Sequence, residues 1–167
     1  MSESKSLEII KQAILLERRG RAFYGKVAEQ AESSAVKEFF EMMAGEESKH
    51  MSVLTEQYKI INETGQFNSA ASDISDSGGV ISAALSKEIK EKIAAAGFES
   101  AAISAAIGFE ESALNLYSSR ASEAEDLEEK MIYNWLADWE RQHLNLLVEI
   151  DKDLTESIWY DNQFWPF

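Results

Sequence analysis

Cysteine is absent from this 167-residue chain, and proline occurs only once, at Pro166. The lack of thiols excludes disulfides, thiolate zinc sites, iron–sulfur clusters and a rubredoxin-type iron centre within this sequence. The rarity of proline, combined with abundant Ala, Glu and Leu, favours a helical protein. The length suits one domain that buries a sizeable core.

Long apolar runs and clustered positive charge are also missing. No run approaches the roughly 18–20 residues of a membrane span, and the polar N-terminal segment carries no signal-like apolar region. These features predict a soluble, cytoplasmic protein. The net charge of −14 disfavours nucleic-acid binding, which needs clustered Lys and Arg. An acidic surface could attract cations or a basic partner, or simply keep a helical protein soluble.

Apolar residues recur at the three- and four-residue spacing of helices that bury one face. This pattern predicts four long helices, at residues 6–31, 34–62, 100–122 and 126–154. The connections within the first and second pairs are short, which favours antiparallel neighbours. The fold class expected is therefore all-α, an antiparallel four-helix bundle.

The two pairs are separated by a long crossover at 64–97. Its first part, 64–80, is rich in Gly, Ser, Asn and Asp and predicts a loop, and a short helix is expected at about 82–96. The bundle would occupy residues 1–155. The remaining residues, 156–167, form an aromatic tail that we expect to pack on the bundle or on a second subunit, since a disordered segment is rarely so apolar.

The chain contains an internal repeat at an offset of 93 residues. At this offset Glu17, Tyr24, Glu47 and His50 coincide with identical residues, namely Glu110, Tyr117, Glu140 and His143. The only two histidines therefore match in register, which indicates a duplicated helical hairpin. The repeat also selects Glu47 over Glu46, which coincides with Trp139, and Glu110 over Glu111, which coincides with Arg18.

The matched Glu and His residues lie on the apolar stripes of their helices. Residues three apart on a helix project to the same side, so each Glu-x-x-His offers a carboxylate and an imidazole to one point in the core. Buried carboxylates need compensation, and two divalent cations would balance four of them. Oxygen and nitrogen ligands suit iron or manganese, and the layout follows the rule for di-metal carboxylate bundles. The predicted ligands are Glu17, Glu47, His50, Glu110, Glu140 and His143.

In these motifs the chain resembles the ferritin-like superfamily, and within it the rubrerythrin group, over about residues 6–62 and 100–154. The resemblance implies a site for two irons, with His50 and His143 each binding one metal. It also implies that Glu47 and Glu110, or Glu17 and Glu140, divide into bridging and terminal ligands, and the sequence leaves open which residues take which role.

Two features depart from typical rubrerythrins. An additional Glu of that group, three residues after the position of Glu110, is replaced here by Ala113. The six remaining ligands are similar to the set of bacterioferritin. Rubrerythrins also often carry a C-terminal rubredoxin domain, whereas this chain has no Cys, so its electrons are expected to come from an external donor protein or small molecule.

Several neighbouring residues have two interpretations. Tyr24 and Tyr117 either hydrogen-bond a ligand carboxylate across the bundle or are core aromatics with satisfied hydroxyls. Trp135 and Trp139 either relay electrons or pack. Gly20 either keeps space beside the metals or allows close helix packing.

The function expected is a di-iron oxidoreductase of rubrerythrin type, active in oxidative stress, which reduces peroxide or O2 or oxidises ferrous iron. The alternatives are a ferritin-like iron-storage protein, a di-manganese catalase-like protein, and a metal-free helical interaction module. A homodimer is expected, because symmetry readily buries an aromatic tail.

Overall fold

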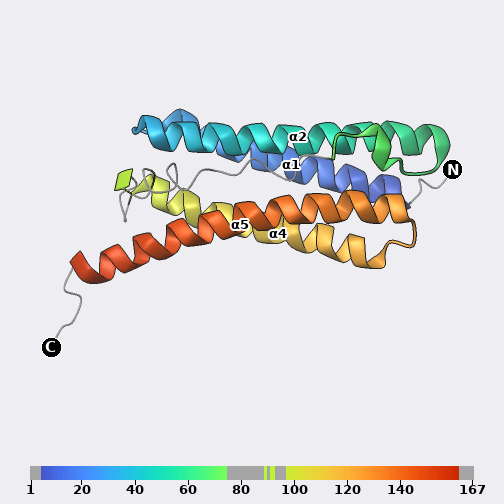
Figure 1. Ribbon diagram of the computed structural model, residues 1–167. Coiled ribbons are helices and arrows are strands. Elements are labelled where there is room, and N and C mark those ends of the chain that lie inside the picture. Colours follow the sequence, from blue (N-terminus) through green and yellow to red (C-terminus); the bar gives the residue numbers. More distant parts are fainter. Residues whose placement is uncertain (1–4, 75–88, 90, 93–96, 162–167) are drawn as a thin grey trace.

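The computed structural model describes residues 5–74, 89, 91–92 and 97–161. It contains four long helices and one short 3₁₀ helix: α1 (Lys5–Gln30), α2 (Ser34–Thr64), η1 (Ser69–Ala71), α4 (Phe98–Glu123) and α5 (Leu127–Asp161). Helices α1 and α2 form one antiparallel pair, α4 and α5 form the other, and the two pairs lie against each other (Figure 1). The predicted all-α, antiparallel four-helix bundle is confirmed.

The crossover begins at a well-defined helix end. Gly65 adopts a left-handed conformation with φ 76°, and its N–H donates to the Ile61 carbonyl at 2.8 Å, an arrangement that favours glycine. The next residues are held against both pairs of helices. Gln57 of α2 donates to the Asn68 carbonyl at 2.7 Å, and the Ser69 N–H donates to Glu128 of α5 at 2.7 Å.

The short crossover helix predicted at about 82–96 lies largely outside the described residues, although Ile89, Glu91 and Lys92 are helical. Helix α5 differs from the prediction. It continues past residue 154 to Asp161, because neither glycine nor proline occurs before Pro166 to end it. The first part of the expected tail is thus helical, while the packing of its aromatic side chains lies outside the described residues.

Two apolar clusters fill the bundle on either side of a polar layer at mid-length. One cluster includes Phe39, Phe40 and Leu147, and the other includes Ile10 and Leu136. Along every long helix, the polar layer falls between the residues of these two clusters. The middle of the bundle is therefore enclosed by apolar side chains at both ends.

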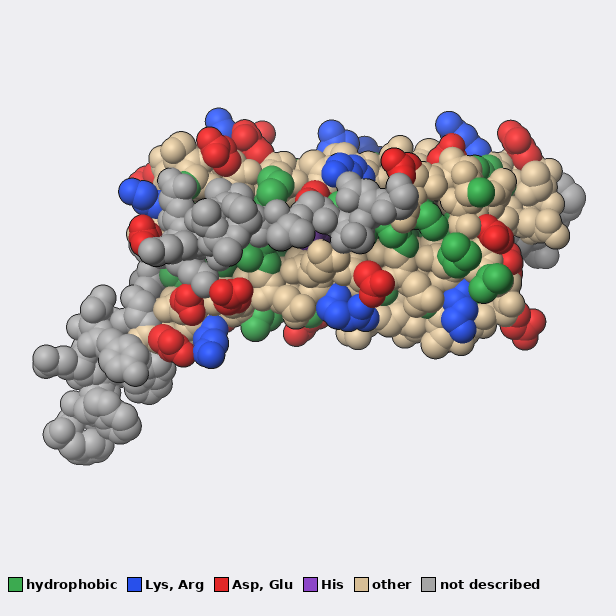
Figure 2. Space-filling view, in the orientation of Figure 1, with side chains coloured by type: hydrophobic (Ala, Val, Ile, Leu, Met, Phe, Trp, Pro, Cys, Tyr) green, Lys and Arg blue, Asp and Glu red, His purple; other side chains and the backbone are tan. Residues whose placement is uncertain are grey.

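Charges of both signs are scattered over the face shown in Figure 2, with small apolar patches between them. The net charge of −14 is therefore not gathered into one acidic patch on this face. Within the described part of the chain, no helix combines the length and apolar character needed to cross a bilayer.

Candidate metal centre

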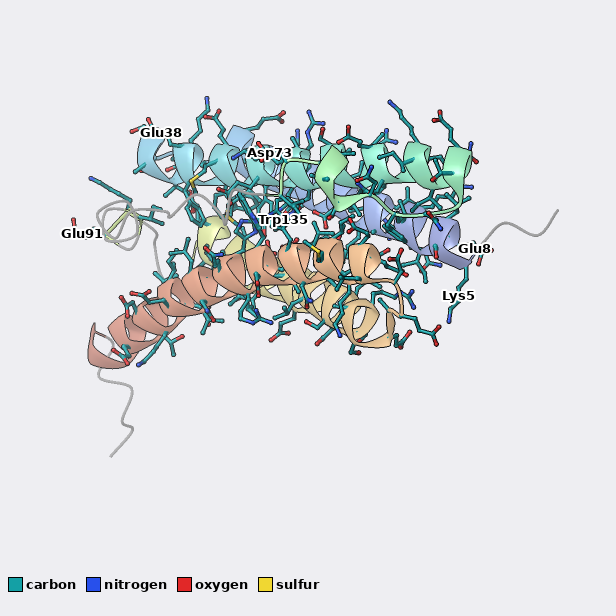
Figure 3. The ribbon with its side chains drawn as sticks, turned by 45° about the vertical axis from the view of Figure 1, so that its right-hand side comes forward. Lys5, Glu8, Glu38, Asp73, Glu91 and Trp135 are labelled. Atoms are coloured by element: carbon teal, nitrogen blue, oxygen red, sulfur yellow. The ribbon has the colours of Figure 1, made fainter. Side chains whose placement is uncertain are left out.

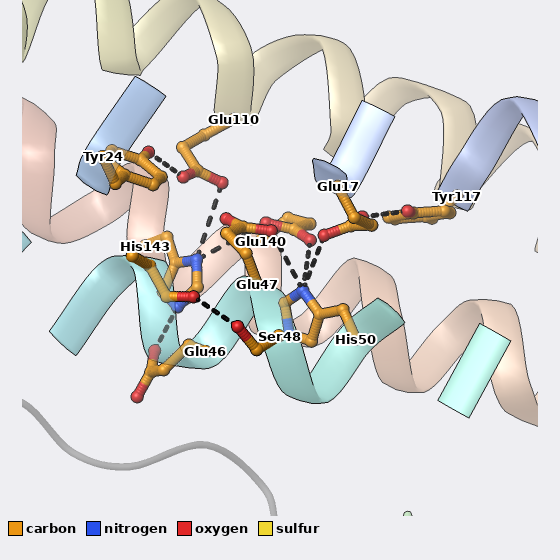
Figure 4. Close-up of polar contacts among 11 residues, drawn as sticks. Glu17, Tyr24, Glu46, Glu47, Ser48, His50, Glu110, Tyr117, Glu140 and His143 are labelled. Carbon is orange, nitrogen blue, oxygen red and sulfur yellow. Dashed lines mark hydrogen bonds and ion pairs between the residues drawn. The ribbon is translucent and has the colours of Figure 1, made fainter. Parts of the chain in front are cut away.

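The polar layer consists of all six predicted ligands. One Glu comes from α1, one from α4, and a Glu-x-x-His pair from each of α2 and α5, so every long helix contributes (Figure 4). None of the six is more than 4% exposed: Glu17, Glu47, His50, Glu110, Glu140 and His143. By contrast Glu111, which the repeat set aside, is exposed.

The first half of the layer surrounds His50. Its Nδ1 atom lies 3.1 Å from Glu17 Oε2, 3.0 Å from Glu140 Oε1 and 3.6 Å from Glu47 Oε2. Ligand atoms of these four residues all lie within 4.8 Å of one another. This spacing allows all four to reach one metal ion.

The second half surrounds His143. Its Nδ1 atom lies 3.6 Å from Glu110 Oε2 and 3.5 Å from Glu140 Oε2. Ligand atoms of His143, Glu47, Glu110 and Glu140 again lie within 4.8 Å of one another. The two imidazole rings are 5.8 Å apart between centroids.

Glu47 and Glu140 belong to both groups. Each carboxylate has two oxygens and can therefore bridge two cations, whereas Glu17 and Glu110 each reach only one group. The two candidate bridges thus come from the helices that carry the histidines. Glu47 and Glu140 are therefore the bridging candidates, and Glu17 and Glu110 are the terminal candidates.

Two tyrosines fix the terminal carboxylates. The Tyr24 hydroxyl on α1 donates to Glu110 on α4, and the Tyr117 hydroxyl on α4 donates to Glu17 on α1 (Figure 4). Both rings are fully buried. Burial and the nearby carboxylates raise the pKa of each tyrosine well above its usual value, so both hydroxyls keep their protons and remain donors.

The protein without metal holds extra protons in this layer. Burial, reinforced by Glu17 and Glu140, raises the pKa of Glu47 well above its usual range. Burial also raises the pKa of Glu110 to about 8. Burial alone would lower the pKa of His50, but the charges of Glu140 and Glu17 reverse the effect and raise it.

Carboxylate–imidazole contacts of the same kind shift the pKa values of His143 and Glu140. Burial alone would lower the pKa of His143, but close contacts with the carboxylates of Glu110 and Glu140 raise it well above its usual value. Burial alone would raise the pKa of Glu140, but His50 and His143 hold it well below its usual range. In the metal-free protein, protons thus compensate the buried negative charge that bound cations would otherwise neutralise.

The donor atoms fit a pair of cations. Both Glu140 oxygens and His143 Nδ1 are buried. Within the described residues they form ion pairs at 3.0–3.6 Å, and none of these contacts has the geometry of a hydrogen bond. Buried polar atoms normally have hydrogen-bond partners, and a bound cation would give these three atoms a partner. Carboxylate oxygen and imidazole nitrogen suit iron or manganese. The layer is therefore compatible with a di-iron site.

Comparison with known proteins shows the family and the fold. The rubrerythrin family model matches residues 8–96, which is more than half of the chain. The chain belongs to the rubrerythrin family. A solved structure of a hypothetical protein from Pyrococcus furiosus shares 22% sequence identity, with a TM-score of 0.64 over 94% of each chain, and shows the same fold. No curated protein matches significantly.

This rubrerythrin-family chain has a small cavity beside three of the ligand carboxylates. Ala113 lines it together with Gly20, Phe109 and the ligands Glu17, Glu47 and Glu110. Its volume of about 10 Å³ is close to the minimum that holds one water molecule. A Cβ at Gly20 would lie 3.4 Å from Glu47 Cδ, so the glycine leaves room beside that carboxylate.

Sequence reasoning missed one polar residue of this rubrerythrin site. Glu46 is only 5% exposed, and its carboxylate accepts a hydrogen bond from His143 Nε2. The repeat gave no signal for it, because its counterpart is Trp139. The signal that could have found it is its position one residue before Glu47, at the edge of the buried stripe of α2.

Replacing Tyr117 with Phe is expected to lower the unfolding free energy of the metal-free protein by about 1–3 kcal/mol, because Glu17 loses its buried donor. Tyr24→Phe should have a similar effect through Glu110. Chemical denaturation in the presence of chelator measures both. Tyr58→Phe, a half-buried tyrosine outside the polar layer, is the matched control, and equal losses in all three variants would contradict the hydrogen-bonding role.

Proposed function

We propose that this rubrerythrin-family protein binds two iron ions and acts as an oxidoreductase, reducing peroxide or O2 or oxidising ferrous iron. The observation that carries the proposal is the pair of ligand groups that share Glu47 and Glu140. Shared carboxylates would hold two metals close together, which suits two-electron chemistry on a dioxygen species because each ferrous ion can supply one electron.

Two ferrous ions would supply two electrons, which with two protons convert one H2O2 molecule into two water molecules. The protein supplies the geometry. Glu17 and Glu110 would hold one ion each, and their tyrosine partners keep these carboxylates oriented. The apolar clusters at both ends of the layer limit water around the reacting groups.

The cavity lined by Ala113 and Gly20 favours the proposal that the substrate is a small molecule. It borders three ligand carboxylates, and its size suits a molecule of one or two heavy atoms better than a larger organic molecule. Because the chain has no Cys, the electrons that return the site to the ferrous state would come from a separate donor.

The test uses protein loaded anaerobically with Fe(II) and mixed rapidly with H2O2 or O2. We expect oxidation of two ferrous ions per H2O2, followed by ferric absorbance. Glu47→Ala and His143→Ala should abolish the reaction, because each removes a ligand. Glu111→Gln, an exposed neighbour of Glu110, should leave it unchanged. Turnover that is equal in the Glu47→Ala/His143→Ala double variant would refute the proposal.

The same donor set also suits manganese. Elemental analysis of protein purified without added metal distinguishes iron from manganese. Bound manganese, together with O2 release from H2O2, would favour a catalase-like protein.

Size-exclusion chromatography tests the alternative of iron storage. A cage of many subunits would favour a storage protein over a redox enzyme.

A further inference from the structure

The two histidines differ at their outer ring nitrogens, although their Nδ1 atoms face the same carboxylate layer. His143 Nε2 donates to the buried carboxylate of Glu46. His50 Nε2 is also buried but forms no hydrogen bond within the described residues. One imidazole is therefore held by a charged acceptor, and the other is not (Figure 4).

The internal repeat explains how this difference arises. Glu46 and Trp139 occupy equivalent positions, each one residue before a shared glutamate. Each also lies beside the histidine of the opposite half. Trp139 is 1% exposed and packs edge-on against His50, with 5.2 Å between ring centroids. An indole has an N–H donor and no lone-pair acceptor, so it cannot replace the carboxylate.

The surroundings of His50 strengthen the contrast. Trp135 extends from α5 toward α2 (Figure 3), and its ring lies 5.8 Å from His50. The ammonium of Lys49 lies 5.4 Å from the centre of the Trp139 ring. Trp139 also lies edge-on to His143, with 6.0 Å between ring centroids. The contrast between the two ends is therefore the carboxylate of Glu46 beside His143 and the additional ring of Trp135 beside His50.

The rest of the layer is closely matched. Each end has one terminal glutamate held by one tyrosine, and both ends share the same two bridging candidates. These ligands are therefore expected to cause only a small difference in metal affinity between the two ends. The main asymmetry is that Trp139 stands in one half of the repeat where Glu46 stands in the other.

We propose that Glu46 is a positioning residue that makes the two metal positions unequal, so that the position at His143 and Glu110 fills first and the position at His50 and Glu17 fills second. The carboxylate fixes the tautomer that leaves Nδ1 free to bind, and it makes the imidazole a stronger donor. Such partners of ligating histidines typically change metal affinity by about 10–100-fold. The inference rests on the proposed metal pair but not on any redox activity.

The experiment adds Co(II), a spectroscopic substitute for Fe(II), to the metal-free full chain and follows visible absorbance and heat release. Wild-type protein should bind two equivalents in two steps at least tenfold apart in affinity. Glu46→Gln keeps the size of the side chain but removes its charge. It should weaken the first step by about 10–100-fold and bring the two steps together, whereas Glu46→Asp should restore part of the separation.

A site-specific signal separates positioning from general stability. With one Co(II) bound to wild-type protein, proton NMR should show one paramagnetically shifted, slowly exchanging imidazole N–H, that of His143. In Glu46→Gln this signal should move or exchange rapidly with solvent. Glu111→Gln is the control and should behave as wild type in both measurements.

The outcomes are distinguishable. If wild-type protein binds no Co(II), the metal pair itself is refuted and the inference fails with it. If wild-type protein binds two ions in equal steps, or if Glu46→Gln keeps the separation, the metal pair stands and the role of Glu46 is refuted.

Discussion

Loading the metal-free protein with Fe(II) under anaerobic conditions is expected to raise its melting temperature by about 8–16 °C. A ligand present at about 1,000 times its Kd stabilises a folded protein by about 4 kcal/mol per site. In a chain of this size, each kcal/mol corresponds to about 2–4 °C. The figure counts only one site, so two filled positions should give a larger shift. Calorimetry with and without chelator measures it.

The rise in melting temperature on loading with Fe(II) should become larger as the pH rises from 5 to 8. In the metal-free protein the pKa of Glu110 is raised from 4.5 to about 8, and the pKa values of Glu47, His50 and His143 are also raised. The folded state therefore holds more protons than the unfolded state in this range. Its stability is greatest at low pH and falls as these protons leave.

Glu140 does not oppose this trend. Its pKa lies below its usual range, so above pH 5 it is ionised both in the folded and in the unfolded state. Bound cations replace the protons, and the melting temperature of the loaded protein should vary less with pH. Because surface charge is the same with and without metal, the loaded protein is the control. Parallel pH curves, or bound metal without a thermal shift, would contradict the expectation.

Replacing Glu47 with Gln is expected to reduce bound metal from two equivalents to one or none, because both groups lose a charged bridging ligand. The metal-free protein should keep its melting temperature within about 2 °C. Burial and neighbouring carboxylates favour the neutral form of this carboxyl, and glutamine has nearly the shape of that form. Co(II) binding and elemental analysis measure the first effect, and calorimetry in chelator measures the second.

Glu111→Gln provides the matched control, since it removes one carboxylate from an exposed position next to a ligand. It should bind two equivalents. A Glu47→Gln variant that still binds two ions with wild-type affinity would show that this carboxylate does not bridge. A large fall in its metal-free stability would show that Glu47 is ionised and paired in the folded protein.

The sequence by itself determined the four helices and the six residues of the polar layer. Both are one-dimensional signals, because a helix repeats every 3.6 residues and a duplicated hairpin repeats at a constant offset. The position of Glu110 on its stripe, and its match with Glu17, required no knowledge of how the helices pack. The choice of Glu110 over exposed Glu111 followed in the same way.

Only the tertiary structure decided which carboxylates are shared and where Glu46 lies. Both depend on the rotation of α2 and α5 about their axes as they face each other, which periodicity within one helix does not specify. The repeat was informative only about features present in both halves. Glu46 and Trp139 differ between the halves, so their contacts with His143 and His50 appear only when those halves are packed together.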